Sequence, residues 1–318
     1  MDEAKRGLLI GVLAALTCEI LFGLSYSFTK SVMGVADEID LLGWRFVVAA
    51  ATILLLRAFR VVRTNLRGKD RRPLLVISGL NPILYFLGET FGIARTSASE
   101  SGMFLACIPV VSIAASSLML GKRPSRRQVV GIVITLVGVL IAVLASGLEL
   151  SFSASGYAIL ALAVLSYSLY TVYVERARGF TGVEITLVML VTGAFFFFTL
   201  FLAKNLWAGA LASSLMLPLS SSAFLVAVLY QGIGCSMLAF FAANTAIRHL
   251  GVNTTSSFIG VSAVVAILAG VLVLGEPLTL LQVVGTGLIL LGVYAANASF
   301  ALPRARRPRR PARMRRAR

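Results

Sequence analysis

Residues 121–131 read GKRPSRRQVVG, and residues 275–285 read GEPLTLLQVVG. The two stretches lie 154 residues apart and share five of eleven letters without a gap. The same shift places Gly138 on Gly292 within the apolar segments that follow. The shared glutamine and the matching glycines distinguish this agreement from the general likeness of apolar sequences. The chain therefore contains an internal repeat, and this repeat decides the fold.

The residues around the repeat have the composition of a membrane protein. Of 318 residues, 58% are hydrophobic and 13% are charged, about half the charged share of a typical soluble domain. Apolar runs of about 15–20 residues, enough to cross the hydrocarbon core of a bilayer, recur along the chain. Together with the breakers and charge clusters between them, they predict ten spanning helices, over residues 8–30, 40–62, 73–94, 101–120, 128–148, 156–175, 183–203, 222–246, 253–274 and 279–300.

The basic residues predict how these helices are oriented, because Lys and Arg gather on the cytoplasmic side of membrane proteins. With a cytoplasmic N-terminus, 25 of the 29 Lys and Arg residues fall on that side. The repeated loop carries four cations from Lys122 to Arg127, but one acid and no cation from Glu276 to Leu281. Five helices per repeat would invert the second copy, and the charges agree with that inversion. We expect both termini in the cytoplasm and the protein in the inner or plasma membrane.

The expected fold is therefore an all-α integral membrane protein built from two inverted five-helix repeats. The first repeat covers residues 1–148, the second covers 149–302, and a basic tail follows over 303–318. Inverted repeats of this kind are typical of secondary transporters, which bind their substrate near the repeat interface.

The net charge of +16 does not by itself indicate nucleic-acid binding. Nine arginines lie between Arg304 and Arg318, a Pro- and Arg-rich stretch after the last apolar run. No aromatic residues are interleaved with them. We expect the tail to bind anionic lipid headgroups, with ~1 kcal/mol for each basic residue near the surface. We expect no nucleic-acid partner. The sequence does not predict the oligomeric state, and a monomer is plausible.

Other function classes lack their sequence motifs. A nucleotide-driven pump would need a phosphate-binding loop and a zinc hydrolase an HExxH pair, and neither occurs. The three cysteines, Cys18, Cys107 and Cys235, all fall in predicted helices and form no metal-binding pair. A channel stays an alternative, although the sequence lacks the rings of charge and the repeated pore loop that are typical of channels. We expect no catalytic residue, no metal and no cofactor.

Three segments resemble EamA-type members of the drug/metabolite transporter superfamily. Residues 96–143 and 249–297 each carry the repeated loop followed by a glycine-rich helix, and the second copy contains LGEPLTLLQVVG. LLGWRFVVAAA, over residues 41–51, is similar to the second helix of the family. The resemblance covers residues 8–300. It implies ten helices in an inverted five-plus-five arrangement, with export of small metabolites, amino acids or xenobiotics.

Two acidic residues lie within the predicted spans and form the core of the candidate site. Glu19 falls in the middle of the first helix, and Glu89 falls nearer the outer end of the third. A charged side chain at a helix centre costs ~2.5–3.5 kcal/mol on insertion scales, so the presence of each acid within a span requires an explanation. They either bind substrate or protons, or stay protonated as packing groups. Because they differ in depth, we do not expect them to pair directly.

Other polar and aromatic residues of the spans are candidates to line a substrate pocket, although packing is the ordinary role of any one of them. Tyr85 lies four residues before Glu89 and so on the same helix face. Two prolines that free backbone carbonyls are candidate gating points or ordinary kinks. The pocket candidates are Tyr26, Asn81, Tyr85, Tyr167, Tyr170, Gln231 and Asn244, and the gating candidates are Pro82 and Pro109.

The sequence also predicts partners for two further charged side chains. Arg45 is expected to pair with Asp37, Asp40 or Glu100 at the outer face rather than to bind an anionic substrate. His249, in a short turn, is expected to be solvated.

These observations favour a secondary transporter that exports small organic solutes by alternating access through a central cavity. Proton coupling and facilitated diffusion are both open. A flippase for a lipid or a lipid-linked sugar on the same fold is the alternative.

Overall fold

The computed structural model describes residues 3–32, 35–93, 107–144, 154–274 and 279–297, together with Arg95 and Leu105. These residues form helices and connecting turns, with no strand among them. In chain order the elements are α1 (Glu3–Val32), α2 (Glu38–Ala58), α3 (Arg72–Ser78), the π-helical segment η1 (Gly79–Leu84), α4 (Tyr85–Ile93), α6 (Ile108–Leu120), α7 (Arg126–Leu144), α8 (Ala154–Arg176), α9 (Gly182–Trp207), α10 (Leu211–Ser220), α11 (Ser222–Leu229), the π-helical segment η2 (Tyr230–Leu238), α12 (Ala239–Leu250), α13 (Val252–Ser256), α14 (Gly260–Leu274) and α15 (Leu280–Asn297).

The outer surface of this bundle is apolar. Seven helices within the described residues are long and apolar enough to cross a membrane. Large apolar side chains such as Leu118, Leu272 and Phe195 are 87%, 80% and 77% exposed. A soluble protein rarely leaves so many large apolar side chains in water, but a bilayer solvates them. The molecule is an all-helical membrane protein.

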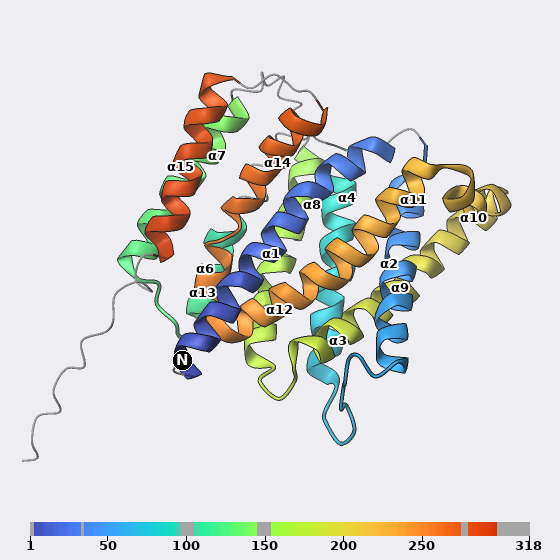
Figure 1. Ribbon diagram of the computed structural model, residues 1–318, viewed down its shortest axis with the longest axis horizontal. Helices are drawn as coiled ribbons and strands as arrows, with labels where there is room; N and C mark the ends of the chain where they lie inside the picture. Colours follow the sequence, from blue (N-terminus) through green and yellow to red (C-terminus); the bar gives the residue numbers. More distant parts are fainter. Residues whose placement is uncertain are drawn as a thin grey trace, which may run out of the picture.

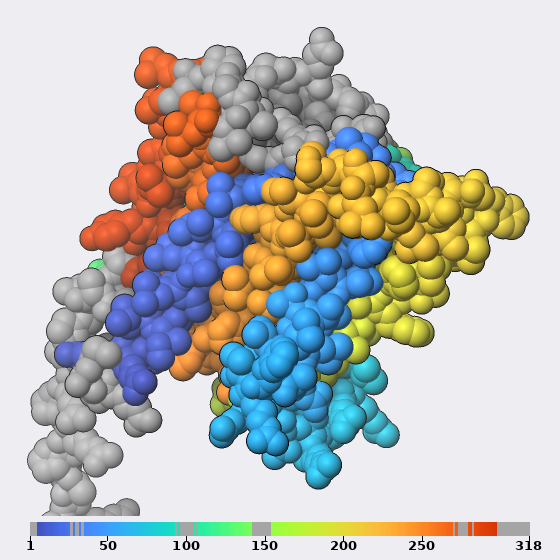
Figure 2. All heavy atoms as spheres, turned by 45° about the vertical axis from the view of Figure 1, so that its right-hand side comes forward, coloured from blue at the N-terminus to red at the C-terminus, as the bar shows by residue number. Residues whose placement is uncertain are grey.

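The described helices are arranged around α1 and α8. Figure 1 shows α7 and α15 side by side along one edge, and α2 and α9 together at the opposite edge. Between these pairs, α1 packs on α12 and α14, and α8 packs on α4 and α6. Figure 2 shows the surface formed where α1 lies against α12. These contacts place α1 and α8 between the two edge pairs, at the centre of the bundle.

Glycines bring α7 and α15 into close contact. A Cβ atom added to Gly131 would lie 2.4 Å from the backbone nitrogen of Ala296, and one added to Gly138 would lie 2.7 Å from the carbonyl oxygen of Gly285. Residue numbers rise along α7 as those of the contacting residues fall along α15, so the two helices are antiparallel. Without side chains at these positions the backbones touch, as small residues permit in membrane helices.

Two of the long helical segments are interrupted by π-helical turns. η1 separates α3 from α4, and η2 separates α11 from α12. Inside η1, Asn81 has φ −142° and ψ 118°, which breaks the regular helix immediately before Pro82. Proline lacks the N–H that the helix would use and its ring clashes with the preceding turn. The kink therefore lies at Pro82, as the sequence predicts.

The structure differs from the predicted ranges at several helix ends, and two of these differences have a clear physical reason. α2 ends at Ala58 rather than at residue 62, where the charged segment after Arg57 leaves the helix. α6 begins at Ile108, so Pro109 occupies the first turn of a helix and not its interior. A proline there costs no helical hydrogen bond, because the first N–H groups have no partner in any helix. Residues 101–104 lie outside the described residues.

An additional helix, α10, occupies part of a segment predicted as a loop. It is too short to span a bilayer. The Ser214 hydroxyl donates to Asn205 Oδ1 (2.9 Å), and the Trp44 indole donates to the Ser214 carbonyl oxygen (3.2 Å). Met216 and Leu219 on the same helix are 54% and 79% exposed. One face is thus docked and the other is apolar, which is typical of a helix lying in the membrane interface.

Candidate functional site

The central helices enclose a small cavity that contains four of the predicted site residues. Its volume is about 70 Å³, and we call it the central cavity. Ligand pockets commonly measure about 300–1,000 Å³, so this cavity is smaller than a typical ligand site. Its lining comes from α1, α4, α6, α8 and α14 and from residues beside them, namely Glu19, Phe22, Ser25, Tyr85, Glu89, Leu105, Ile108, Tyr167, Ile259 and Ser262.

Glu19 and Glu89 both line this cavity, although the sequence predicts that they lie apart in depth. Glu19, from α1, is 5% exposed. Glu89, from α4, accepts a hydrogen bond from the Tyr85 hydroxyl at 2.8 Å. Within the described residues, neither carboxylate has a lysine or arginine in ion-pair contact. Two acids therefore line one small cavity together with a hydroxyl group, and no basic side chain among the described residues forms an ion pair with them.

Aromatic rings form the wall beside these acids. The ring centroids of Tyr85 and Tyr167 lie 5.2 Å apart, and those of Tyr167 and Tyr170 lie 5.4 Å apart. Phe86 packs edge-on against Tyr85. The negative faces of such rings attract cations. Carboxylates next to aromatic rings can bind a proton, an ammonium group or another organic cation.

Tyr170 and Asn244 form a separate polar network. The Tyr170 hydroxyl donates to Asn244 Oδ1 at 2.7 Å, and Asn244 Nδ2 donates to Thr186 Oγ1 at 3.0 Å. All three side chains are buried. Satisfied buried networks fix helix positions, and this one joins α8, α9 and α12 next to the central cavity.

Arg45 does not pair with Asp37 or Asp40, which corrects the sequence prediction for these two acids; Glu100, the third acid that it named, lies outside the described residues. Its Nε donates to Ser236 Oγ at 2.7 Å, and its NH1 donates to Gln231 Oε1 at 3.0 Å. Lys204, on α9, forms the ion pairs with both Asp37 and Asp40.

The reason lies in helix geometry. Arg45 is seven residues along α2 from the helix end that carries Asp37, about 10 Å at 1.5 Å per residue. At that depth its guanidinium lies over the Phe86 ring, 4.4 Å from the centroid. Gln231 is consequently a partner of Arg45 rather than part of the cavity lining.

The remaining candidates lie outside the cavity lining. Asn81 is buried, and its Oδ1 has no hydrogen-bond partner among the described residues. Pro82 packs where a side chain on Gly193 would clash. The side chain of Tyr26 lies outside the described residues. A gating role for Pro82 or Pro109 stays a prediction.

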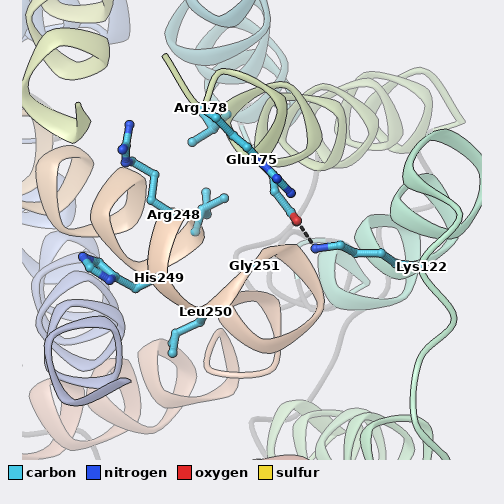
Figure 3. A pocket seen from close by; sticks show the side chains of 9 residues that line it. Lys122, Glu175, Arg178, Arg248, His249, Leu250 and Gly251 are labelled. Atoms are coloured by element: carbon cyan, nitrogen blue, oxygen red, sulfur yellow. Dashed lines mark hydrogen bonds and ion pairs between the residues drawn. The ribbon is translucent and has the colours of Figure 1, made fainter. Parts of the chain in front are cut away.

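Sequence reasoning missed a second cavity of about 400 Å³. Glu175, at the end of α8, forms an ion pair with Lys122 in the loop after α6 (Figure 3). The partners are 53 residues apart, and no local pattern links them. His249 is exposed and lines this cavity as well. We call this cavity the vestibule; its lining residues are Lys122, Val174, Glu175, Arg178, Ile247, Arg248, His249, Leu250 and Gly251.

Comparison with known proteins assigns the chain to a family. The model of the EamA-like transporter family matches twice, over residues 9–144 and again over residues 154–298. The chain belongs to the EamA-like transporter family. This membership makes it a membrane transporter and not an enzyme.

Curated relatives agree with the EamA assignment. An uncharacterized transporter of Bacillus subtilis, YcxC, is 28% identical over 94% of this chain and 96% of its own length. A probable terminal-alkyne amino-acid exporter of Streptantibioticus cattleyicolor is 23% identical over 71% of this chain and 73% of its own length. One solved structure covers 91% of this chain and 96% of its own with a TM-score of 0.70 at 16% identity, a likeness of fold alone.

Proposed function

We propose that this EamA protein is a secondary transporter that exports small organic solutes with an amino group, amino acids foremost, by alternating access through the central cavity. One observation carries the proposal: Glu19, which is buried, and Glu89, which is partly buried, line the same small cavity, and no basic side chain among the described residues forms an ion pair with either. A buried carboxylate without a cation is costly, so the site needs a proton or a positively charged ligand. When a proton replaces the bound solute at these carboxylates, and a new solute later replaces the proton, solute export is coupled to proton entry.

The cavity walls support an ammonium group as the recognised feature. Tyr85 and Tyr167 place aromatic rings beside the acids, which adds cation–π attraction to the charge interaction. One relative carries a name that describes an amino-acid exporter. The cavity in its present closed form is smaller than such a solute requires. Transport therefore includes a movement that opens it to one side of the membrane at a time.

A frame of ten spans in two inverted repeats, residues 1–148 and 149–302, is part of the proposal. The π-helical interruptions support it, because η1 shifted by 154 residues falls on residues 233–238, inside η2. The helix contacts support it too. Gly131 lies against Gly292, and Gly138 lies against Gly285. A shift of 154 residues carries Gly131 to Gly285 and Gly138 to Gly292, so the repeat relates each of these contacts to the other. Two antiparallel helices related by an in-plane axis have contacts of this kind.

The membrane orientation is also proposed from charge. Both termini lie in the cytoplasm, and the protein resides in the cell membrane. The excess of Lys and Arg at the end of the bundle where α1 begins supports this orientation. The basic tail, residues 303–318, would then contact anionic headgroups of the inner leaflet.

Reconstitution tests the function directly. The purified full-length chain is placed in liposomes with an imposed pH gradient, and uptake of each standard amino acid is measured from pH 5.5 to 8. Wild type is expected to accumulate at least one amino acid in response to the gradient. Glu19→Gln and Glu89→Gln should abolish accumulation, while Glu38→Gln, an exposed acid at the start of α2, should not.

Three results would point elsewhere. Unchanged rates and pH profiles in both cavity variants would reject the proton-coupled mechanism and favour facilitated diffusion. Lipid movement between leaflets without amino-acid flux would favour a flippase. Transport limited to solutes without an amino group would reject the substrate class.

A further inference from the structure

The vestibule is large enough to bind a small molecule. Its volume of about 400 Å³ lies within the common range of about 300–1,000 Å³ for ligand sites. It lies at the end of the bundle where α1 begins, because a side chain on Gly7 would approach His249 and one on Gly11 would clash with Leu250. Under the proposed orientation, this end faces the cytoplasm, where an exported solute is loaded.

Glu175 provides a carboxylate at the inner wall of the vestibule. One of its oxygens pairs with the Lys122 ammonium, and the other accepts from the backbone N–H of Val252 at 2.9 Å. The Glu175 side chain is 9% exposed, whereas the Lys122 side chain is 44% exposed. The acid is thus fixed, while its cationic partner reaches in from solvent on a flexible chain. Such partly exposed pairs contribute little net energy and exchange readily.

Two arginine side chains that have no acidic partner among the described residues also line the vestibule. Arg178 follows α8 and Arg248 belongs to the last turn of α12. Neither side chain forms a hydrogen bond or an ion pair with any described residue, and both line the vestibule (Figure 3). Partial burial and then the positive charge of Arg178 lower the pKa of Lys122, so cations crowd this space. Guanidinium groups bind carboxylates in bidentate geometry.

We propose that the vestibule is a loading site for α-amino acids, in which the α-ammonium replaces Lys122 on Glu175 and the α-carboxylate binds Arg178 and Arg248. This inference rests on the proposed function. The Lys122 side chain ends in the same group that the solute would present, a primary ammonium ion. In the structure, the Lys122 ammonium therefore occupies the position on Glu175 that the α-ammonium of the solute would take.

The position of Glu175 gives this exchange a consequence for transport. Glu175 lies eight residues beyond Tyr167 on α8, which is about 12 Å along the helix. Glu175 also links the loop after α6, through Lys122, to the first residue of α13, Val252. α6 and the turn between α13 and α14 line the central cavity at Ile108 and Ile259. Release of Lys122 by a solute would separate these segments on the loading side.

Binding to the purified full-length protein in lipid nanodiscs tests the site. Isothermal titration calorimetry is carried out with each of the twenty standard amino acids. The tightest binder is then compared with its methyl ester, which lacks the carboxylate, and its N-acetyl form, which lacks the ammonium. Each derivative is expected to bind at least ten-fold more weakly than the amino acid. Binding by none of the twenty, or equal binding of both derivatives, would overturn the proposal.

Variants of the pair separate a loading site from a structural contact. Glu175→Gln should weaken binding at least ten-fold, whereas Lys122→Met should strengthen it several-fold by removing the competing ammonium. Lys122→Arg keeps a cation and should stay near wild type. If Lys122→Met weakens binding as Glu175→Gln does, the pair only holds the fold and the proposal is wrong.

A second set of variants keeps the test decisive if those proteins fold poorly. The double variant Arg178→Gln/Arg248→Gln alters only exposed side chains and should remove the preference for the amino acid over its methyl ester. A retained preference contradicts the proposed carboxylate contact.

Glu89→Gln separates this inference from the proposed function, because it should lose transport and keep vestibule binding. Transport by wild type without any vestibule binding would reject the loading site alone.

Discussion

The central cavity and the vestibule hold their carboxylates in opposite ways. In the central cavity, Glu89 accepts one hydrogen bond from Tyr85, and Glu19 lies nearby without an ion pair to a described residue. In the vestibule, both oxygens of Glu175 are occupied, one by Lys122 and the other by Val252. The first arrangement leaves room for a proton or a ligand to provide the missing partner. The second is complete without one and therefore stabilises the fold until a competitor arrives.

The largest effect should follow removal of an acid from the central cavity. Glu19→Gln or Glu89→Gln replaces a carboxylate by a neutral amide of similar shape. Because the charged partner of the solute is lost from a buried site, we expect transport in liposomes to fall on the order of 100-fold. The unfolding temperature should stay the same or rise, since no protein ion pair is broken. A fall in stability with transport intact would reverse the roles assigned to the two cavities.

Removal of the vestibule acid should give the opposite pattern. Glu175→Ala leaves Lys122 without its counter-charge and Val252 N–H without its acceptor. Loss of one partner from a buried pair costs about 3–5 kcal/mol, and the exposure of Lys122 reduces this to about 2–3 kcal/mol. Thermal unfolding in detergent, compared with that of Glu38→Ala, measures the difference. Equal unfolding temperatures would mean that the pair contributes nothing to the fold.

A smaller effect should follow removal of one hydroxyl group. Tyr85→Phe keeps the ring against Tyr167 but removes the donor to Glu89. Hydrogen bonds to charged groups contribute about 1.5–3 kcal/mol, so we expect roughly a ten-fold rise in the KM for export. Tyr294→Phe is the matched control, because Tyr294 is 70% exposed on α15. An effect of equal size in the control would assign the change to general packing.

Those features of the two cavities that depend on local sequence pattern could be predicted from the sequence. Apolar runs predicted the long helices, and the unmatched acids Glu19 and Glu89 stood out because charge within a span is costly. The spacing of four residues between Tyr85 and Glu89 placed both on one face, and the structure confirms their hydrogen bond. The repeated loop also anticipated the two matches to the family.

The parts that depend on helix rotation and contact between distant segments could not be predicted. Depth along a helix suggested that Glu19 and Glu89 lie apart, but the tilt of α1 against α4 and α8 brings both to one cavity. Arg45 was assigned to the nearest acids in sequence, whereas its partners are 186 and 191 residues away. The Lys122–Glu175 pair was missed for the same reason.

The smallest expected effect concerns the backbone beside the vestibule. Gly251 has φ +79°, and a Cβ atom there would lie 3.4 Å from both Glu175 Oε2 and Lys122 Nζ. Gly251→Ala should lower the free energy of unfolding by about 1 kcal/mol, because a side chain disfavours this conformation. Gly68→Ala has a similar φ of +72° but no atom within 4 Å of the added Cβ. Both variants should lose similar stability, and only Gly251→Ala should also weaken amino-acid binding in the vestibule. Equal binding by the two variants would show that the space beside Glu175 is not used by a ligand, and the vestibule would then be a structural contact only.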